Sequence, residues 1–263
     1  MKIIVCIKQV PATSKVEIDP ENGTLKRLDV ESKTNGYDLF ALETALCLKE
    51  AAGGSVTAIT MGPPQAEEAL RDAYMMGVDE CVLLSDREFA GADVLATSFT
   101  LSQGIRLLGG FDLILCGKQT TDGDTAQVGP ALAEHLNIPH VSWARGLKPA
   151  AGGLQVTHDL SANTQVSELS FPCLVTVDSG HCVPRLPSYL LLKETADRLV
   201  LVLAHSDMPG SGLTQYGLNG SPTAVQRTFP PESVRTRQML EGDKAAALID
   251  ILAEKKFIGE GVD

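Results

Sequence analysis

Residues 111–138 read FDLILCGKQTTDGDTAQVGPALAEHLNI. This stretch opens with an apolar run that is typical of a buried strand and closes with a run that has helical spacing. Small, polar and acidic residues lie between the two. In an open parallel sheet, ligands collect beyond the carboxyl ends of the strands, where the strand order reverses. The stretch therefore predicts a strand–loop–helix unit whose loop is a candidate binding site.

Four further apolar runs predict strands of the same kind. Each is rich in Val, Ile or Leu, as expected of a strand that is covered on both faces. The runs are KIIVCI (2–7), SVTAIT (55–60), ECVLL (80–84) and PCLVTV (172–177). Helical patterns at 37–52, 65–77, 92–108 and 131–138 alternate with the strands. This alternation predicts βαβ units, and hence an α/β fold with a doubly wound, mostly parallel sheet.

The pattern changes after residue 140. The runs GLQVTHDL (153–160) and TQVSELS (164–170) alternate between apolar and polar residues, which predicts an antiparallel excursion or a sheet edge. A stretch rich in Gly, Ser and Pro at 205–222 predicts an extended loop. A helix follows, EGDKAAALIDILAEKK, with an apolar stripe of Ala245, Leu248, Ile249 and Leu252. We expect an α/β domain at 1–205 and a linker with a helical arm at 206–263, the arm covering either its own domain or another subunit.

Composition excludes several classes of protein. The 263 residues are 44% hydrophobic and carry a formal net charge of −11, with a pI of about 4.9. This charge repels a phosphate polyanion, so nucleic acid is not an expected partner. No apolar run approaches the roughly 20 residues that span a bilayer, and MKIIVCIKQV is too short for a signal peptide. The sequence predicts a cytoplasmic protein without membrane insertion.

The reactive residue types form no known catalytic or metal motif. The six cysteines, Cys6, Cys47, Cys81, Cys116, Cys173 and Cys182, contain no CxxC pair, so most are expected to be buried thiols, with Cys182 the most exposed. The five histidines are scattered, which argues against a metal site. The chain has neither a G-x-G-x-x-G after the first strand nor a Walker loop. Asp178-Ser179-Gly180-His181 contains the residue types of a catalytic triad but no nucleophile elbow.

The loop after the run FDLILC has features that suit a phosphate. Gly117 and Gly123 permit close approach of the backbone to a ligand. Asp124 or Thr125 is positioned to cap the next helix, whose first N–H groups carry a partial positive charge. Asp122 and Asp124 would repel a phosphate in direct contact, and Pro130 lacks an N–H, so the helix must begin just before it. From these features alone, a capped turn without any ligand remains an equal alternative.

Several motifs together resemble the β subunit of electron transfer flavoproteins. The resemblance covers roughly residues 1–200 and runs through KIIVCIKQVP, NGYDLFALETAL, TMGPPQAEEALRDAYMMGVDE, CGKQTTDGDTAQVGP and VPRLPS. It implies a Rossmann-like sheet and a C-terminal helical arm that packs on an α subunit holding one FAD. The family's β subunit binds a second adenine nucleotide, which is AMP in ordinary members and a second FAD in electron-bifurcating members.

The loop resembles the bifurcating type, which reads D-G-D-T-A-Q-V-G-P at these positions, as residues 122–130 do here. Small side chains at 123 and 126 leave room for a diphosphate. The resemblance implies a cofactor site formed by Cys6, Lys8, Asn35, Tyr37, Asp38, Met61, Gly62, Gly117, Asp122, Gly123, Asp124, Thr125, Ala126, Gln127 and Val128. The chain departs from the family in three places: Gly36 stands where Pro is usual, SGHCVPRLPS lacks the Leu that anchors acyl-CoA dehydrogenase, and YLLLKETADR replaces a Lys-rich stretch.

The function that this resemblance implies is electron bifurcation. NADH would reduce FAD on the β subunit. One electron would then pass through the α-subunit FAD to an acyl-CoA or hydroxy-acid dehydrogenase, and the other would pass to ferredoxin or flavodoxin. The alternative is the AMP-binding, one-flavin electron carrier. A second alternative is a stand-alone nucleotide-binding regulatory protein. An adenylating enzyme is disfavoured because KQVPATSK, after the first strand, has no glycine.

Overall fold

The computed structural model describes residues 1–12, 31–160, 163–180, 182–209, 212–226 and 239–258. The chain divides into two compact units, Met1–Arg227 and Thr228–Asp263. Three expected features lie outside the described residues: the turn at 161–162, His181, and the part of the linker at 227–238.

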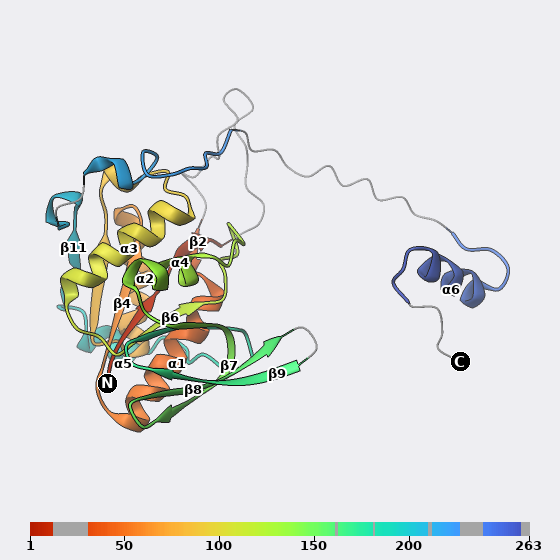
Figure 1. The fold of residues 1–263 in the computed structure, drawn as a ribbon, viewed down its shortest axis with the longest axis horizontal. Coiled ribbons are helices and arrows are strands. Elements are labelled where there is room, and N and C mark those ends of the chain that lie inside the picture. Colours follow the sequence, from red (N-terminus) through yellow and green to blue (C-terminus); the bar gives the residue numbers. More distant parts are fainter. Residues whose placement is uncertain (13–30, 161–162, 181, 210–211, 227–238, 259–263) are drawn as a thin grey trace. The chain divides into compact units, whose positions relative to one another are not determined.

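The first unit is built on one large sheet, which in the described ranges has nine strands (Figure 1). Their spatial order is β11-β5-β4-β1-β6-β10-β7-β8-β9, and β2 and β3 pair separately. The strands are β1 Lys2–Cys6, β2 Gln9–Pro11, β3 Ser32–Thr34, β4 Ser55–Met61, β5 Glu80–Leu84, β6 Leu113–Gly117, β7 His140–Ala150, β8 Gly153–Leu160, β9 Asn163–Ser170, β10 Cys173–Val177 and β11 Leu201–Leu203.

The strands from β11 to β7 are all parallel, and β8 and β9 continue the sheet in antiparallel fashion. This confirms the doubly wound, mostly parallel sheet and its antiparallel edge. The sequence did not reveal β7, which carries an irregularity: between Val175 and Val177 of β10, the partner residue moves from Val141 to Ala144. The extra residue in β7 is a β-bulge, which redirects side chains at the end of the strand.

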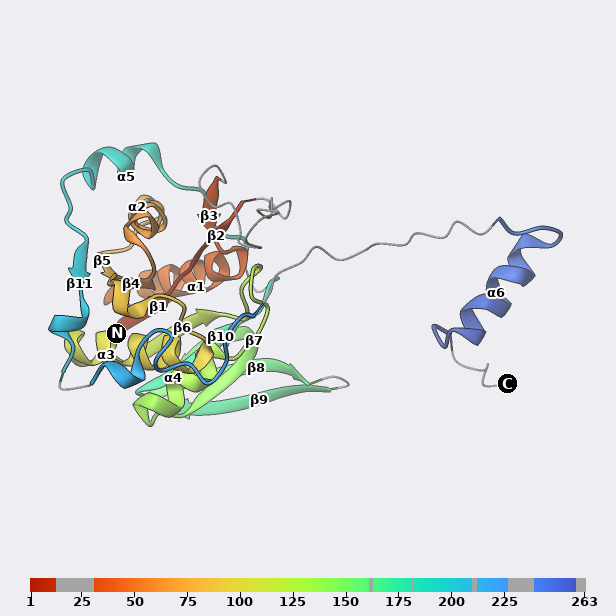
Figure 2. The same cartoon turned by 90° about the horizontal axis from the view of Figure 1, so that it is seen from above.

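Helices cover both faces of the sheet. The helices of the first unit are α1 Gly36–Ala52, α2 Glu67–Met76, α3 Val94–Leu108, α4 Val128–Leu136 and α5 Tyr189–Glu194. α1 and α2 pack on the face that carries Ile3 and Val5, and α3 and α4 pack on the face that carries Ile4. Figure 2 shows α1, α2 and α5 on one side of the sheet and α3 and α4 on the other. Successive buried residues of β1 face opposite sides of the sheet, so helices are needed on both faces to cover them.

Helix ends follow the local signals in the sequence. Gly53 and Gly77 end α1 and α2 with φ of 72° and 113°, a left-handed region that glycine enters without strain. α3 begins at Asp93, whose carboxylate accepts hydrogen bonds from the N–H groups of Leu95 and Ala96. These signals place the helices close to their expected positions.

The segment 204–226, after β11, has no α-helix or strand among its described residues, as a loop should, but it is part of the first unit. It contains the short turns His205–Asp207 and Leu213–Gln215. Tyr216 is only 1% exposed and lies among the aromatic rings of Phe89, Phe99 and His205. A single buried aromatic residue therefore anchors a Gly- and Ser-rich stretch whose composition predicts a loop. The first unit consequently extends past residue 205, to Arg227.

The second unit contains α6 Lys244–Glu254, which confirms the expected C-terminal helix. Asp243 caps this helix by accepting hydrogen bonds from the N–H groups of Ala245 and Ala246. Among the described residues, no helix is long and apolar enough to cross a membrane.

Candidate nucleotide-binding crevice

The strand order reverses between β1 and β6. From β1 the chain moves outward to β4 and β5, and it then returns to place β6 on the other side of β1. A crevice at the carboxyl ends of two such strands is where doubly wound sheets bind ligands. The segments after β1 and β6 are the two loops in which the sequence predicted most of the site. The structure therefore brings them together at one edge of the sheet.

The floor of this crevice is organised by Asp38, at the start of α1. Its carboxylate accepts a hydrogen bond from the backbone N–H of Lys8, with Oδ2 at 2.7 Å, and another from the backbone of Gly117. Burial raises the pKa of Asp38 to about 7, even though the hydrogen bonds from Asn35, Lys8 and Gly117 oppose this shift. One buried carboxyl group thus joins the ends of β1 and β6 to the first turn of α1.

Gly117 is required by this floor. A Cβ atom at residue 117 would lie 2.3 Å from Oδ1 of Asp38 and 2.7 Å from the backbone carbon of Tyr37. The backbone at Gly117 was predicted to approach a ligand closely. In the structure it closely approaches the first turn of α1. Gly123 has a different environment, because a Cβ atom there would meet only Oγ1 of Thr120, at 3.5 Å.

The rim of the crevice is the loop 118–127, which follows β6. Lys8 reaches it through an ion pair between its Nζ and Oδ2 of Asp122, at 2.7 Å. Burial tends to raise the pKa of Asp122, but the hydrogen bond and the charge of Lys8 outweigh it, so this pKa is lowered. Asp124 and Ala126 have φ of 52° and 55°, a left-handed conformation that is uncommon for residues other than glycine. The rim is therefore a tightly turned loop with one lysine held against it.

Asn35 connects the floor to the rim. This fully buried side chain donates a hydrogen bond from Nδ2 to the carbonyl of Gln119, at 2.8 Å. Its Oδ1 accepts from the N–H of Thr121, at 3.2 Å. The amide of Asn35 thus satisfies two backbone groups of the loop that a strand or helix would otherwise pair.

The start of α4 differs from the expectation. We predicted that Asp124 or Thr125 caps this helix, but the N-cap residue is Gln127, and no side chain caps it. The carboxylate of Asp124 accepts a hydrogen bond from Gln119 instead. Pro130 is the third residue of the helix, where its missing N–H costs no intrahelical bond, so the helix begins before it as expected. The first N–H groups of α4 are therefore available to an anion.

The remaining predicted residues divide into two groups. Cys6 is buried in the core, where it is hydrogen-bonded to Cys116; this contact and burial raise the pKa of Cys116. The others lie along the same edge. Tyr37 is in the first turn of α1, Met61 and Gly62 are at the end of β4, and the rest are in the loop before α4 or at its start: Thr125, Ala126, Gln127 and Val128.

Sequence reasoning missed several polar and aromatic residues beside the crevice. Lys118, directly after β6, forms an ion pair with Asp178 at 3.0 Å and lies 4.8 Å from the ring centre of Trp143. Thr176 of β10 accepts a hydrogen bond from the N–H of Trp143, at 2.9 Å. The GKQ sequence was a signal for Lys118, but no pattern marked Trp143, because β7 itself was not predicted.

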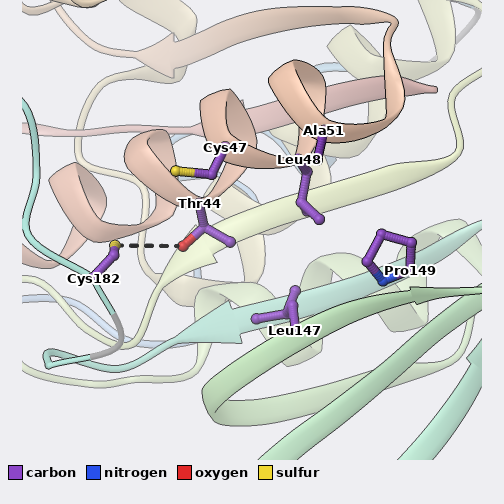
Figure 3. Close-up of a pocket in the computed structure, with 7 residues that line it drawn as sticks. All are labelled: Thr44, Cys47, Leu48, Ala51, Leu147, Pro149 and Cys182. Atoms are coloured by element: carbon purple, nitrogen blue, oxygen red, sulfur yellow. Dashed lines mark hydrogen bonds between the residues drawn. The ribbon is translucent and has the colours of Figure 1, made fainter.

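Figure 3 shows a second hollow, of about 210 Å³, between α1 and β7. It is lined by Thr44, Cys47, Leu48, Ala51, Leu147, Pro149 and Cys182. Cys182 lies 3.9 Å from Thr44 and is half-buried, whereas Cys47 is exposed, so the prediction that Cys182 is the most exposed cysteine is wrong. Burial raises the pKa of both thiols, so neither is an activated nucleophile.

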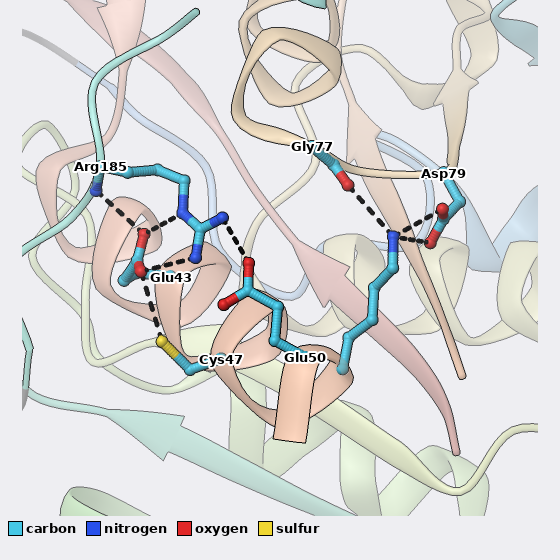
Figure 4. Close-up of polar contacts among 7 residues, drawn as sticks. Glu43, Cys47, Glu50, Gly77, Asp79 and Arg185 are labelled. Carbon is cyan, nitrogen blue, oxygen red and sulfur yellow. Dashed lines mark hydrogen bonds and ion pairs between the residues drawn. The ribbon is translucent and has the colours of Figure 1, made fainter. Parts of the chain in front are cut away.

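Ion pairs join the segment around Arg185 to α1 next to this hollow (Figure 4). The guanidinium group of Arg185 contacts Glu43 at 2.9 Å and Glu50 at 2.7 Å. Burial tends to raise the pKa of Glu43, but the hydrogen bonds from Arg185 outweigh it, so the pKa is lowered. Lys49, on the same helix, forms an ion pair with Asp79 at 2.6 Å. These contacts fasten α1 to its neighbours and do not belong to the crevice.

The described residues of the crevice offer groups for an anion and no set of metal ligands. In the part of the chain that the structure describes, no cluster of three metal-ligating residues occurs. The start of α4 offers uncapped N–H groups to a phosphate. Oγ1 of Thr34, next to Asn35, and Oγ1 of Thr60, next to Met61, are buried and lack a partner within the described ranges. Buried hydroxyl groups of this kind need a bound ligand or water to satisfy them.

The fold and the crevice together define a doubly wound α/β protein with a ligand site at its switch point. Comparison with known families is more specific, because the electron transfer flavoprotein domain matches residues 22–199. The chain belongs to the electron transfer flavoprotein family.

Three relatives illustrate where it stands in that family. It is 42% identical over 270 residues to the acryloyl-CoA reductase electron transfer subunit gamma of Anaerotignum propionicum, covering 98% of this chain and 100% of the relative. It is 41% identical to the caffeyl-CoA reductase-Etf complex subunit CarD of Acetobacterium woodii, with the same coverage. It is also 41% identical, again at 98% and 100%, to the electron transfer flavoprotein subunit beta of Clostridium acetobutylicum. This chain is therefore similar over its length to β-type subunits.

Proposed function

We propose that this chain binds FAD in the crevice between β1 and β6 and acts as the β subunit of an electron-bifurcating complex. The observation that carries the proposal is the loop at 122–130, which spans the rim and the uncapped start of α4. Its residues form the D-G-D-T-A-Q-V-G-P pattern, with small side chains where a diphosphate needs space. When bound, FAD supplies the redox chemistry, which no residue of the crevice provides.

The residues of the crevice have distinct roles in this proposal. The first N–H groups of α4 bind the diphosphate, and their partial positive charge favours it. Asn35 holds the loop at the position that the diphosphate requires, through Gln119 and Thr121. Lys8 neutralises Asp122, so that the nearest carboxylate of the rim does not repel the ligand.

The names of the relatives indicate the setting. One is an electron transfer subunit of acryloyl-CoA reductase, and another is a subunit of a caffeyl-CoA reductase-Etf complex. We accordingly propose an α subunit carrying its own FAD, an acyl-CoA or hydroxy-acid dehydrogenase, and NADH as the electron donor. Ferredoxin or flavodoxin is the second acceptor. The apolar stripe of α6 would pack on the α subunit, so the role of the C-terminal unit would be to bind that subunit.

The test is a count of nucleotides in the purified complex. This chain is produced together with its α subunit, the complex is denatured, and the released nucleotides are separated and quantified. Two FAD molecules for each heterodimer support the proposal. One FAD and one AMP overturn it and identify an ordinary, one-flavin electron carrier. If no nucleotide is assigned to this chain, for example because the isolated α subunit already contains all of it, the crevice is not a cofactor site.

A further inference from the structure

Trp143 has an unusual backbone conformation. Its φ is 63°, in the left-handed region that bulky residues avoid because the Cβ atom crowds the following carbonyl group. The residue lies in the bulge of β7, where the register against β10 shifts. A strained conformation at a bulge persists only where the surrounding structure holds it, and such positions concentrate at functional sites.

Two contacts hold Trp143 in place. Its N–H donates to Oγ1 of the buried residue Thr176, at 2.9 Å. The ammonium group of Lys118 lies 4.8 Å from the centre of its ring, an attractive cation–π distance. Lys118 is itself fixed by the ion pair with Asp178, at 3.0 Å. The ring is therefore oriented by groups at the ends of β6 and β10.

The same contacts connect Trp143 to the crevice. Lys118 is the first residue of the loop that forms the rim. The methyl group of Thr176 packs so closely on α4 that a Cβ atom at Gly129, in the first turn of that helix, would lie 2.5 Å from it. One threonine thus holds the backbone of Trp143 with its hydroxyl group and supports the start of α4 with its methyl group. Trp143 is therefore connected through a single residue, Thr176, to the start of α4, which is the place proposed for the diphosphate.

Trp143 is nevertheless 45% exposed as a residue. Tryptophan has the largest apolar surface of any side chain, so leaving it exposed in a strained conformation has no benefit for folding. Lys118 occupies one side of the ring, and a flat ligand can cover the exposed part. Aromatic side chains bind nucleotides in this way, by stacking on a planar ring.

We infer that Trp143 is a stacking platform for a planar heteroaromatic ring of the nucleotide bound in the crevice. This inference rests on the proposed nucleotide site and adds a contact residue to it. The ring is either the adenine or the isoalloxazine of FAD. Both offer the same stacking chemistry, and the ligands used in the test distinguish them.

The test uses variants of the complete αβ complex. Trp143→Asn removes the ring, and Asn tolerates a left-handed conformation, so the fold is retained. Trp143→Phe keeps an aromatic platform. Tyr189→Asn is the matched control, because Tyr189 is also exposed, with Lys193 at 4.7 Å from its ring. Its helix begins at the C-terminal end of α2, where the N–H of Ser188 donates to the carbonyl of Met75. This position is away from the carboxyl edge of the sheet.

The first measurement is the nucleotide affinity of each complex after its exchangeable nucleotide has been removed. We expect Trp143→Asn to bind about fivefold to about a hundredfold more weakly, because loss of one stacking contact has this effect. Trp143→Phe should lose less, and Tyr189→Asn should bind as the unmodified complex does.

The second measurement follows the fluorescence of Trp143 itself, with each complex saturated with ligand. Trp143 is the only tryptophan of this chain, so the fluorescence of the unmodified complex minus that of Trp143→Phe isolates it. We expect quenching when the ligand binds. Quenching by AMP identifies adenine as the stacked ring, and quenching by FAD but not by AMP identifies the isoalloxazine.

Three outcomes overturn the inference while leaving the proposed function intact. The first is full nucleotide content with equal affinity in Trp143→Asn. The second is fluorescence of Trp143 that no nucleotide changes. The third is a Trp143→Asn chain that binds nucleotide normally but no longer assembles with the α subunit, which would make Trp143 an interface residue. A complex in which this chain binds no adenine nucleotide refutes the proposed function itself.

Discussion

Two aspartates of the crevice have opposite environments. Asp38, in the floor, is buried, and its pKa is raised to about 7 by that burial. Asp122, in the rim, has a side chain that is 34% exposed, and its pKa is lowered because the ion pair with Lys8 outweighs partial burial. The same chemical group is thus a fixed structural acceptor in the floor and an adjustable surface charge in the rim.

The difference shows which part of the crevice is rigid. The floor is joined by short hydrogen bonds among Lys8, Asp38 and Gly117, and there is no space for an added atom. The rim depends on exposed contacts and one buried amide, Asn35. Changes to the floor should therefore alter the stability of the protein, and changes to the rim should have small effects on stability.

The largest expected effect is a pH dependence caused by Asp38. Its pKa in the folded state is about 7, above the usual 3.8, so the folded protein keeps a proton that the unfolded chain releases. This contribution to the free energy of unfolding is complete below pH 4 and declines as pH rises to about 7. The total is about 4 kcal/mol, because each pH unit between the two pKa values corresponds to roughly 1.4 kcal/mol. Asp38→Asn should remove this decline.

Urea unfolding at pH 5, 6, 7 and 8 measures it. The difference in free energy of unfolding between the unmodified chain and Asp38→Asn should change from pH 5 to about 7 and level off by pH 8. Asp122→Asn is the control, because a group with a lowered pKa does not titrate between pH 5 and 8. If both variants show the same flat difference, the carboxyl group of Asp38 is not held protonated by burial.

The second effect compares two glycines. Gly117→Ala places a methyl group 2.3 Å from Oδ1 of Asp38, so the floor must move, and we expect a loss of about 3 kcal/mol in stability. Gly123→Ala meets only Thr120 at 3.5 Å, and alanine reduces the entropy of the unfolded chain, so stability should be unchanged or rise by up to about 1 kcal/mol. Thermal unfolding of both variants tests this. Equal destabilisation would mean that floor and rim are equally tight.

The third effect concerns the connection between the two regions. Asn35→Ala leaves the carbonyl of Gln119 and the N–H of Thr121 without a partner, which should cost about 2 kcal/mol. Thr121→Ala is the control, because its backbone N–H still donates to Asn35 and stability should change by less than about 0.5 kcal/mol. Urea unfolding of the two variants decides. A small effect of Asn35→Ala would show that water replaces the amide and that the rim does not depend on the floor.

The sequence predicted the floor and the rim unequally. Buried strands such as β1 and β6 produce apolar runs, so their positions followed from pattern alone, whereas their adjacency in the sheet did not. Gly117 was singled out from the loop sequence and Asp38 through the resemblance, but their mutual contact was not predicted, because it joins residues far apart in the chain. The cap of α4 was predicted wrongly, because Asp124 has several possible partners and the sequence around it does not show that Gln119 is the one it binds.

Other features had no signal in the sequence. β7 contains a bulge and mixes Trp143, Arg145 and Lys148 with apolar residues, so it has neither the run of a buried strand nor strict alternation. Tyr216 lies in a Gly-rich stretch, and only the aromatic cluster in the folded protein shows that it is buried. Both features, the strand β7 and the burial of Tyr216, depend on tertiary contacts of single aromatic residues. Local composition does not reveal such contacts.

The smallest expected effect lies in the rim. Lys8 and Asp122 have side chains that are 44% and 34% exposed, so solvent screens most of the 2.7 Å ion pair. Asp122→Asn should therefore change the free energy of unfolding by less than about 1 kcal/mol, and the change should disappear at high salt. Lys8→Gln combined with Asp122→Asn gives the interaction energy by a double-mutant cycle. An interaction energy comparable with the effect of Asp38, and insensitive to salt, would place Asp122 in the rigid floor and remove the distinction between the two regions.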